Sequence, residues 1–336
     1  MGKDQYCNCN RNRNYFRYAC LSFICLYFCV AISAEPAKDS LQEFSRPKTF
    51  DFITNVPSTM IDAWKISFNS KPETLWAWGA VASSTLLLYI YDEKILNGCQ
   101  RLGRNLHLGN DDHTETIISL NDNNIFRGPT DIGSTLYFLG DGWMHSFIGA
   151  GFLVSGAFAN NNRALQTGSQ IFNGLISATI PNQLLKRSFG RESPFRRTKE
   201  RGNWVPFPNP SRYNADASKY DAMPSGHVTT ATMTFTIIDA NYPEYRYFIR
   251  PLAIAWITLL GFQMVNNGVH WSSDYPLAIA MGYVVGRAAS KQGRVNSSNS
   301  NENHLAEKLI DWNILPIAFS DPQMGSTYGA MLNLKF

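Results

Sequence analysis

The stretch DAMPSGHVTT, residues 221–230, interrupts an otherwise apolar and aromatic chain. Its Pro, Ser and Gly are turn and cap residues, and the run that follows predicts a helix over about 225–240. One interpretation is a turn followed by an ordinary N-cap. The other is an anion-binding corner, because the N–H groups and the positive dipole end of a helix start attract phosphate. In that case Ser225 and Gly226 contact the anion, and His227 is placed to protonate a leaving oxygen.

Two further stretches carry residues of the same chemistry. In LLKRSFGRESPF (184–195), Lys186 ends a predicted helix and Arg191 follows five residues later. In NNGVHWSSDYPLA (266–278), His270 and Asp274 stand four residues apart, which on a helix would bring the carboxylate to the ring. A carboxylate on one ring nitrogen leaves the other free as a nucleophile or base. Lys186 supplies a point charge for phosphate oxygens.

The remaining pattern predicts an all-α bundle of about six core helices with a short β-like tail. The tail YGAMLNLKF (328–336) alternates with a period of two residues, as a strand does, and we expect an edge strand packed on the bundle. Residues 119–133 are expected to form a polar loop, and 187–223 a Pro-, Arg- and Asn-rich connection. The helices are expected at about 75–91, where Asp92 begins a charged boundary, and at about 141–159, 163–186, 225–240, 247–265 and 270–290.

The N-terminal residues 1–34 resemble a secretory signal, with several Arg before the apolar run LSFICLYFCVAISA and a polar break after it. An uncleaved anchor is the alternative. We therefore expect export to the periplasm or a membrane, with the outer membrane as a minority interpretation of the terminal Phe. The expected parts are the signal (1–34), an N-terminal segment with the first core helix (35–140), a core that carries the three stretches (141–290), and a linker with the tail (291–336).

Composition excludes several classes of protein. Five of the six cysteines lie in the first 29 residues, so the exported chain would hold neither a disulfide scaffold nor a cysteine zinc site. The net charge of +4, with no dominant basic block, gives no nucleic-acid signal. Short apolar runs and a mean hydropathy of −0.20 favour buried core helices over membrane spans. The oligomeric state is left open.

In order, spacing and residue types, the three stretches resemble the type-2 phosphatidic acid phosphatase superfamily. It includes bacterial non-specific acid phosphatases, lipid phosphate phosphatases and vanadium haloperoxidases. Its motifs are Lys, six residues, Arg-Pro; then Pro-Ser-Gly-His; then Ser-Arg, five residues, His, three residues, Asp. The matches are Lys186 with Pro194, the complete PSGH at 224–227, and His270 with Asp274. The resemblance covers about 141–290.

The resemblance implies a role for each matched residue. His270 attacks phosphorus and forms a phosphohistidine, Asp274 orients His270, and His227 protonates the leaving group. Lys186, Ser225 and Gly226 hold the phosphoryl oxygens. No metal ion and no cofactor is implied. A metal site built from the two histidines and Asp274 is the less favoured interpretation, because Lys186 and the helix start suit an anion.

The chain departs from the family at both motif arginines. Ser193 stands where the first is expected and Met264 where the second is, with Gln263 before it. In other enzymes, losing one hydrogen-bond donor to the transition state lowers the rate on the order of 10²–10³-fold. In the haloperoxidases both arginines hold vanadate, so haloperoxidase activity is disfavoured here. We expect Arg191, or another arginine of the same loop, to fill one vacancy. The other loop arginines are Arg187, Arg196, Arg197 and Arg201.

The leading hypothesis is a metal-independent phosphatase acting on phosphomonoesters or diphosphates, with lipids preferred because the chain is apolar and aromatic. The alternative is a weak or inactive anion- or lipid-binding protein on the same scaffold, favoured by the missing arginines. A phosphotransferase differs only in its acceptor. The less favoured interpretation is that His227 and His270 are ordinary core histidines. His145 is expected to be structural or to line a pocket.

Overall fold

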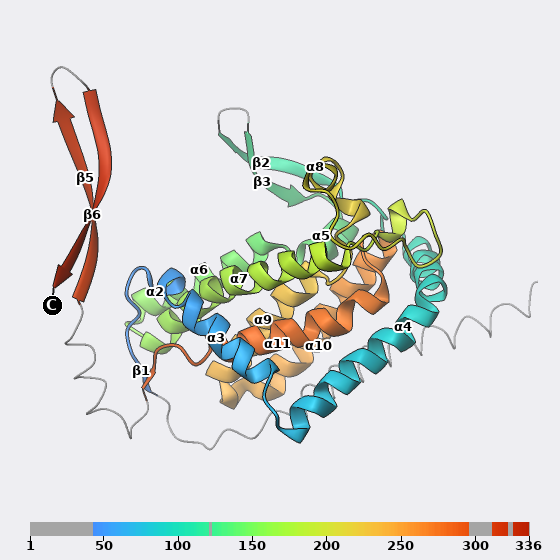
Figure 1. The fold of residues 1–336 in the computed structure, drawn as a ribbon, viewed down its shortest axis with the longest axis horizontal. Helices are drawn as coiled ribbons and strands as arrows, with labels where there is room; N and C mark the ends of the chain where they lie inside the picture. The colour runs from blue at the N-terminus through green and yellow to red at the C-terminus, as the bar shows by residue number, and fades with distance from the viewer. Residues whose placement is uncertain (1–42, 121–122, 296–310, 322–324, 336) are drawn as a thin grey trace, which may run out of the picture. The chain divides into compact units, whose positions relative to one another are not determined.

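The computed structural model describes residues 43–120, 123–295, 311–321 and 325–335. Residues Arg46–Gly293 form one compact unit that is built mainly of helices (Figure 1), which confirms the predicted all-α class. The α-helices are α2 (Asp51–Thr54), α3 (Val56–Ser67), α4 (Pro72–Asn105), α5 (Ile132–Phe138), α6 (Gly142–Phe158), α7 (Asn162–Phe189), α8 (Pro210–Ala215), α9 (Gly226–Asn241), α10 (Arg246–Asn266) and α11 (Tyr275–Ala289). Four 3₁₀ turns accompany them, η1 (Pro194–Arg196), η2 (Ala217–Lys219), η3 (Pro243–Tyr245) and η4 (Ser272–Asp274).

Helix α9 lies at the centre of this unit and packs against α7, α10 and α11. Its contact with α11 is very close, because Gly282 and Gly286 lie one turn apart on α11 and face the α9 backbone. A Cβ built on Gly282 would lie 2.5 Å from the Thr229 carbonyl, and one on Gly286 would lie 2.8 Å from the Met233 carbonyl. The two glycines therefore let the α9 backbone, with its Thr232 and Thr236 side chains, lie directly against α11.

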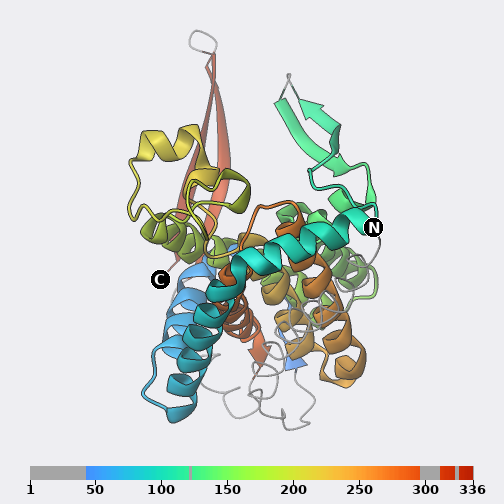
Figure 2. The ribbon, with the colours of Figure 1, turned by 90° about the vertical axis from the view of Figure 1, so that its right-hand side faces the viewer.

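Helix α4 is much longer than its apolar run. The sequence predicts an end at the charged residues 92–94, but the helix continues to Asn105 (Figure 2). Asp92 does not end the helix because its side chain is buried and hydrogen-bonded, at 1% exposure. Beyond it, Leu96 is buried in the core cluster shared with α9, α10 and α11.

Two other local predictions differ from the structure. The expected polar loop at 119–133 contains most of a hairpin, in which β2 (Thr114–Leu120) pairs antiparallel with β3 (Asn123–Pro129), and α5 follows. The helix expected from 270 begins only at Tyr275, because Pro276 occupies its first turn. Proline is favoured there, since the first N–H groups of a helix have no internal acceptor, and it is disfavoured further inside.

The C-terminal part forms a second unit, which contains only strands among its described residues. The short strands β1 (Glu43–Phe44) and β4 (Arg294–Val295) pair, and β5 (Asp311–Asp321) pairs antiparallel with β6 (Gly325–Lys335). The predicted terminal strand is therefore present, with a second tail strand as its partner. The predicted signal (1–34) and most of the predicted linker (290–304) lie outside the described residues.

One described helix, Pro243–Asn266, is long and apolar enough to cross a membrane. Only 39% of its most apolar stretch is buried inside the protein. Much of this helix is therefore exposed, whereas the sequence predicts a buried core helix. Its exposed large hydrophobic side chains are Tyr245, Tyr247, Phe248, Leu252 and Leu259. Helix α4 also exposes apolar residues, among them Leu75, Trp76, Leu86, Leu87 and Ile90.

Candidate active site

The backbone around Arg191 joins the three sequence stretches. Gly190 ends α7 in the left-handed region (φ 57°), where a Cβ would overlap the Val205 carbonyl. The next residue, Arg191, accepts a hydrogen bond from the Ala222 N–H at 3.0 Å. The Ala222 carbonyl oxygen in turn lies 2.6 Å from Nδ1 of His270. The end of α7, the approach to α9 and the segment before η4 therefore meet at one place.

The His270 ring has a defined orientation and is 3% exposed. A carbonyl oxygen can only accept, so its contact with Ala222 places the hydrogen on Nδ1 and leaves the lone pair on Nε2. Asp274 does not reach the ring through a helical turn, because His270 precedes the helix. Its Oδ2 lies 3.5 Å from Nδ1 and accepts a hydrogen bond from the Trp271 N–H at 2.8 Å. The closest partner of the ring is thus the Ala222 carbonyl.

The predicted anion corner forms the start of α9. Ser225 is the N-cap, and its hydroxyl accepts from the Val228 N–H at 3.4 Å. The N–H groups of Gly226 and His227 belong to the first turn, where a helix offers no internal acceptor. Asn182 of α7 lies beside this turn, since its Oδ1 would be 3.6 Å from a Cβ on Gly226. These groups surround a place that suits an anion.

Lys186 lies in the last turn of α7, one turn beyond Asn182, and is 9% exposed. Its Nζ is 3.5 Å from Oδ2 of Asp221, which is part of the approach to α9. The positive charge of Lys186 also acts on His227, as one of the causes that lower the pKa of that ring. Lys186 is therefore close to the second motif, with Asp221 as its counter-ion.

His227 is enclosed by residues from α5 and the turn before α6. The Tyr137 ring lies 4.8 Å from its ring, and a Cβ on Gly140 would lie 2.5 Å from its Cβ. Burial, together with the charges of His270, Lys186 and His145, lowers the pKa of His227 to about 3. His227 is therefore neutral at pH 7 in the unliganded protein.

The structure places the guanidinium of Arg191, predicted to bind phosphate, in a fully buried position where it binds carboxylates. It donates to Asp92 at 2.7 Å through one terminal nitrogen and to Asp274 through the other. The rings of Tyr89, Trp204 and Trp271 surround it, with centroids 5.2, 4.9 and 5.3 Å from Cζ. In this arrangement the charge of Arg191 is already balanced by two carboxylates.

The two positions expected to hold arginine are filled by buried uncharged residues. Met264 is part of the core cluster, and its Sδ lies 3.9 Å from the Ser225 hydroxyl. Ser193 begins η1, and its N–H donates to the Ser218 carbonyl. The other loop arginines contact partners as follows: Arg187 contacts Gln183 and Tyr213, Arg196 contacts Asp216, Arg197 contacts Glu93, and Arg201 contacts Tyr89.

The sequence reasoning missed three residues near the site. Asp92 lies far from the motifs in sequence, and no local signal marks it as anything but a helix boundary. Asn182 precedes Lys186 by one helical turn, a spacing that places both on one face and could have identified it. Tyr137, which covers His227, has no such signal. His145 is fully buried, in keeping with a structural role, and neither ring nitrogen makes a hydrogen bond of normal geometry.

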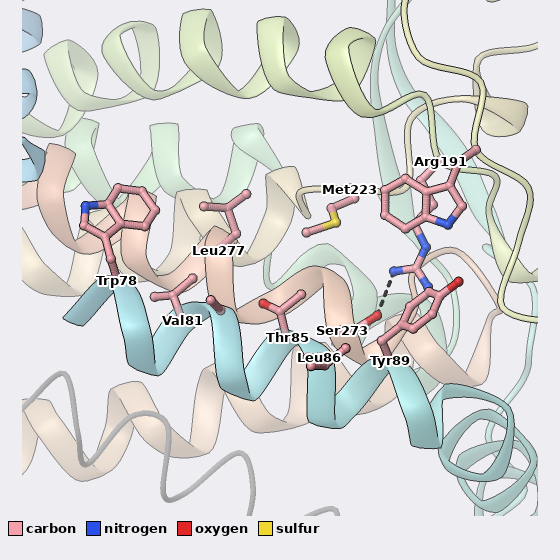
Figure 3. Close-up of a pocket in the computed structure, with 11 residues that line it drawn as sticks. Trp78, Val81, Thr85, Leu86, Tyr89, Arg191, Met223, Ser273 and Leu277 are labelled. Atoms are coloured by element: carbon pink, nitrogen blue, oxygen red, sulfur yellow. Dashed lines mark hydrogen bonds between the residues drawn. The ribbon is translucent and has the colours of Figure 1, made fainter. Parts of the chain in front are cut away.

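An apolar groove of about 400 Å³ lies along α4 and ends at Arg191 (Figure 3). Trp78 lies at one end, and Arg191 with Tyr89 at the other. Met223, directly before the second motif, and Ser273, within the third, form part of its lining. The remaining lining residues are Val81, Ala82, Thr85, Leu86, Trp204 and Leu277.

Comparison with known proteins gives one match. A family model described as the PAP2 superfamily matches residues 168–297, which include all three stretches and helices α9, α10 and α11. No curated protein and no solved structure matches the chain. The match confirms the resemblance that the three stretches carry. Helix α4, with Asp92, lies outside the matched residues.

Proposed function

We propose that the chain, whose residues 168–297 match the PAP2 superfamily model, hydrolyses phosphomonoesters or diphosphates through a phosphohistidine at His270. The family supports phosphatase activity on phosphate esters in general. The observation that carries the finer proposal is the contact between Nδ1 of His270 and the Ala222 carbonyl. It leaves Nε2 with the lone pair that a nucleophile needs.

In the proposed first step, the Nε2 lone pair forms a bond to phosphorus and the bond from phosphorus to the leaving oxygen breaks. His227 gives its proton to that oxygen. The N–H groups at the start of α9, with Ser225, Gly226 and Lys186, hold the other phosphoryl oxygens. In the second step, the oxygen of a water molecule forms a bond to phosphorus and His227 takes a proton from that water. The bond between phosphorus and Nε2 of His270 breaks, its electron pair returns to Nε2, and phosphate is released. No metal ion is needed for either step.

His227 must carry a proton to donate it, but its low pKa in the unliganded site leaves the ring neutral at pH 7. An unliganded site surrounds the ring with Lys186, His270 and His145, which disfavour its protonated form. A bound phosphate group adds negative charge beside the ring and favours the protonated form. We therefore propose that binding of the anionic substrate raises the pKa of His227, so that the ring takes up from solvent the proton that it later donates.

A lipid substrate is favoured by the apolar groove, which approaches the motifs through Met223 and Ser273. Exposed apolar side chains on α4 and α10 support association with a membrane. Export to the periplasm or a membrane remains the proposal made from residues 1–34. The basic connection from Arg187 to Lys219 suits an anionic surface.

The alternative function is a weak or inactive anion-binding protein, favoured by one specific observation. Met264 and Ser193 leave the two arginine positions uncharged, and Arg191 is balanced by carboxylates. On this alternative, the corner at α9 binds phosphate groups without cleaving them. The intact pair of histidines favours hydrolysis.

The test measures phosphate release by the chain from Glu35 onward, in EDTA, on an aryl phosphate and on a panel of lipid phosphates. We expect release that resists EDTA and disappears in His270→Ala. The lipid panel then decides between lipid and soluble substrates. A folded protein that binds phosphate but releases none from any ester would support the binding alternative. Release that EDTA abolishes would contradict the metal-independent mechanism.

A further inference from the structure

Both carboxylate oxygens of Asp92 accept hydrogen bonds close to the site. Its Oδ1 accepts from the Ser272 hydroxyl at 2.8 Å and from the Ser273 N–H at 3.0 Å. Its Oδ2 accepts from the Ser273 hydroxyl and, at 2.7 Å, from Arg191. Both oxygens are thus occupied, and the residue fixes η4, whose last residue is Asp274, to α4.

The cluster formed by Asp92, Arg191 and Asp274 contains two carboxylates and one guanidinium. All three side chains are buried, with 0% exposure for both carboxylates and for Arg191. When both carboxylates are ionised, the cluster carries a net charge of −1. Water screens buried charges only weakly, so the net charge of this cluster affects the energy of any charge that develops nearby.

That balance matters at His270, which lies 3.5 Å from Asp274. When Nε2 bonds to phosphorus while Nδ1 keeps its hydrogen, the ring acquires a positive charge. Asp274 alone would stabilise that charge. Arg191, bound directly to Asp274, opposes this effect, because it places a positive charge against the same carboxylate.

We propose that Asp92 is a positioning residue that neutralises Arg191, so that the negative charge of Asp274 remains available to the phosphorylated His270. Arg191 bonds to both carboxylates, and Asp92 cancels the positive charge that Arg191 places against Asp274. This inference rests on the proposed function, because it concerns the charge that His270 acquires during the reaction. Neither Asp92 nor Arg191 contacts the phosphoryl group in this scheme.

A purely structural role for the cluster predicts a different outcome from a role in charge balance. If the cluster only holds α4 to η4, removing both partners damages the site more than removing one. If charge balance matters, removing both charges leaves Asp274 with a net charge of −1, as in the wild type. The double variant is therefore the informative one.

The experiment compares wild type, Asp92→Asn, Arg191→Gln and the double variant, with kcat and KM measured on an aryl phosphate. We expect kcat of Asp92→Asn to fall about 20-fold or more, with KM changed less than about threefold, because phosphate contacts are retained. We expect the double variant to recover kcat to within about threefold of the wild type. Phosphohistidine trapped by alkaline quenching should follow the same order. Asp239→Asn is the matched control, since it removes an ion-paired carboxylate on α9, 3.1 Å from Arg250.

Each outcome supports or overturns the inference. A kcat of Asp92→Asn equal to that of Asp239→Asn, or a double variant no better than Asp92→Asn, overturns it. If Asp92→Asn does not fold by circular dichroism, the double variant decides alone: kcat near the wild type supports the inference, and kcat below about one-twentieth overturns it. Absence of any activity in the folded wild type would instead overturn the proposed function, and this inference with it.

Discussion

The Sδ atom of Met264 lies 3.9 Å from the hydroxyl of Ser225, in the space where the family pattern has an arginine. Met264 is completely buried, so this contact is part of the core. The second motif is therefore supported on one side by a thioether instead of a cation. A charged side chain at 264 would have to be stabilised by an anion at the α9 corner.

Met264→Arg is expected to lower the free energy of unfolding by roughly 3 kcal/mol in the absence of phosphate, because an unpaired charge replaces a core side chain. Added inorganic phosphate should restore part of that loss by binding the folded state. Thermal unfolding with and without phosphate measures both effects. Met264→Leu is the control, and it should show no larger response to phosphate than the wild type. An equal phosphate response in all three proteins would place the anion away from residue 264.

Asp221→Asn should strengthen the binding of inorganic phosphate about threefold, because Asp221 both pairs with Lys186 and repels an anion beside it. Lys186→Met should weaken the same binding by about tenfold or more. Competitive inhibition of aryl phosphate hydrolysis gives both constants. Glu244→Gln, which breaks the Arg163–Glu244 pair at 2.7 Å, is the control and should leave inhibition unchanged. Weaker inhibition in Asp221→Asn would contradict the assigned position of the anion.

His145 makes protein stability dependent on pH. Burial lowers its pKa from 6.5 to about 4, against an opposing effect from the Leu139 backbone. Between these values the unfolded chain binds the proton and the folded chain does not, so stability falls as pH falls from 6.5 towards 4. The loss of unfolding free energy due to His145 reaches roughly 3 kcal/mol once the pH is near 4. The low pKa of His227 acts in the same direction.

His145→Leu should therefore unfold with nearly the wild-type free energy at pH 7 and lose less stability towards pH 4. Urea unfolding across this range measures the difference. The change at pH 7 is expected to stay within about 1 kcal/mol, because neither ring nitrogen makes a hydrogen bond of normal geometry. His113→Gln, at an exposed histidine, is the control and should follow the wild-type curve. A parallel curve for His145→Leu would show that His145 is protonated or solvated in the folded state.

Gly282→Ala should destabilise the protein by roughly 1–3 kcal/mol, although alanine is ordinarily the better helix former. The new methyl group would lie 2.5 Å from the Thr229 carbonyl and force α9 and α11 apart. Gly151→Ala on α6 is the control, since its Cβ would meet nothing within 4 Å, and it should be neutral or stabilising. Chemical unfolding compares the two variants. Equal stability of both would mean that α9 moves without cost.

The fold class and the three motif positions could be predicted because they depend on local patterns. Helices α6, α7, α9 and α10 follow from apolar runs with caps such as Asn161 and Ser225, and their boundaries agree closely with the structure. The C-terminal strand follows from its alternation. These signals lie within a few residues of the elements they specify.

The partners of His270 and Arg191 could not be predicted, because they come from distant parts of the chain. A spacing of four residues predicts a helical contact between His270 and Asp274, but Pro276 delays the helix, and the Ala222 carbonyl takes the ring hydrogen. Asp92 lies 99 residues from Arg191. A buried carboxylate at such a separation leaves no pattern in one sequence.

Helix α4 has a consequence for how this protein can be shortened. The family segment at 168–297 contains every motif residue, yet α4 supplies both Asp92 and one wall of the groove. A fragment limited to that segment would keep its signature and lose the counter-charge, so Arg191 would face water with one carboxylate instead of two. A shortened form of this protein that keeps Asp92 beside Arg191 must therefore begin no later than α4.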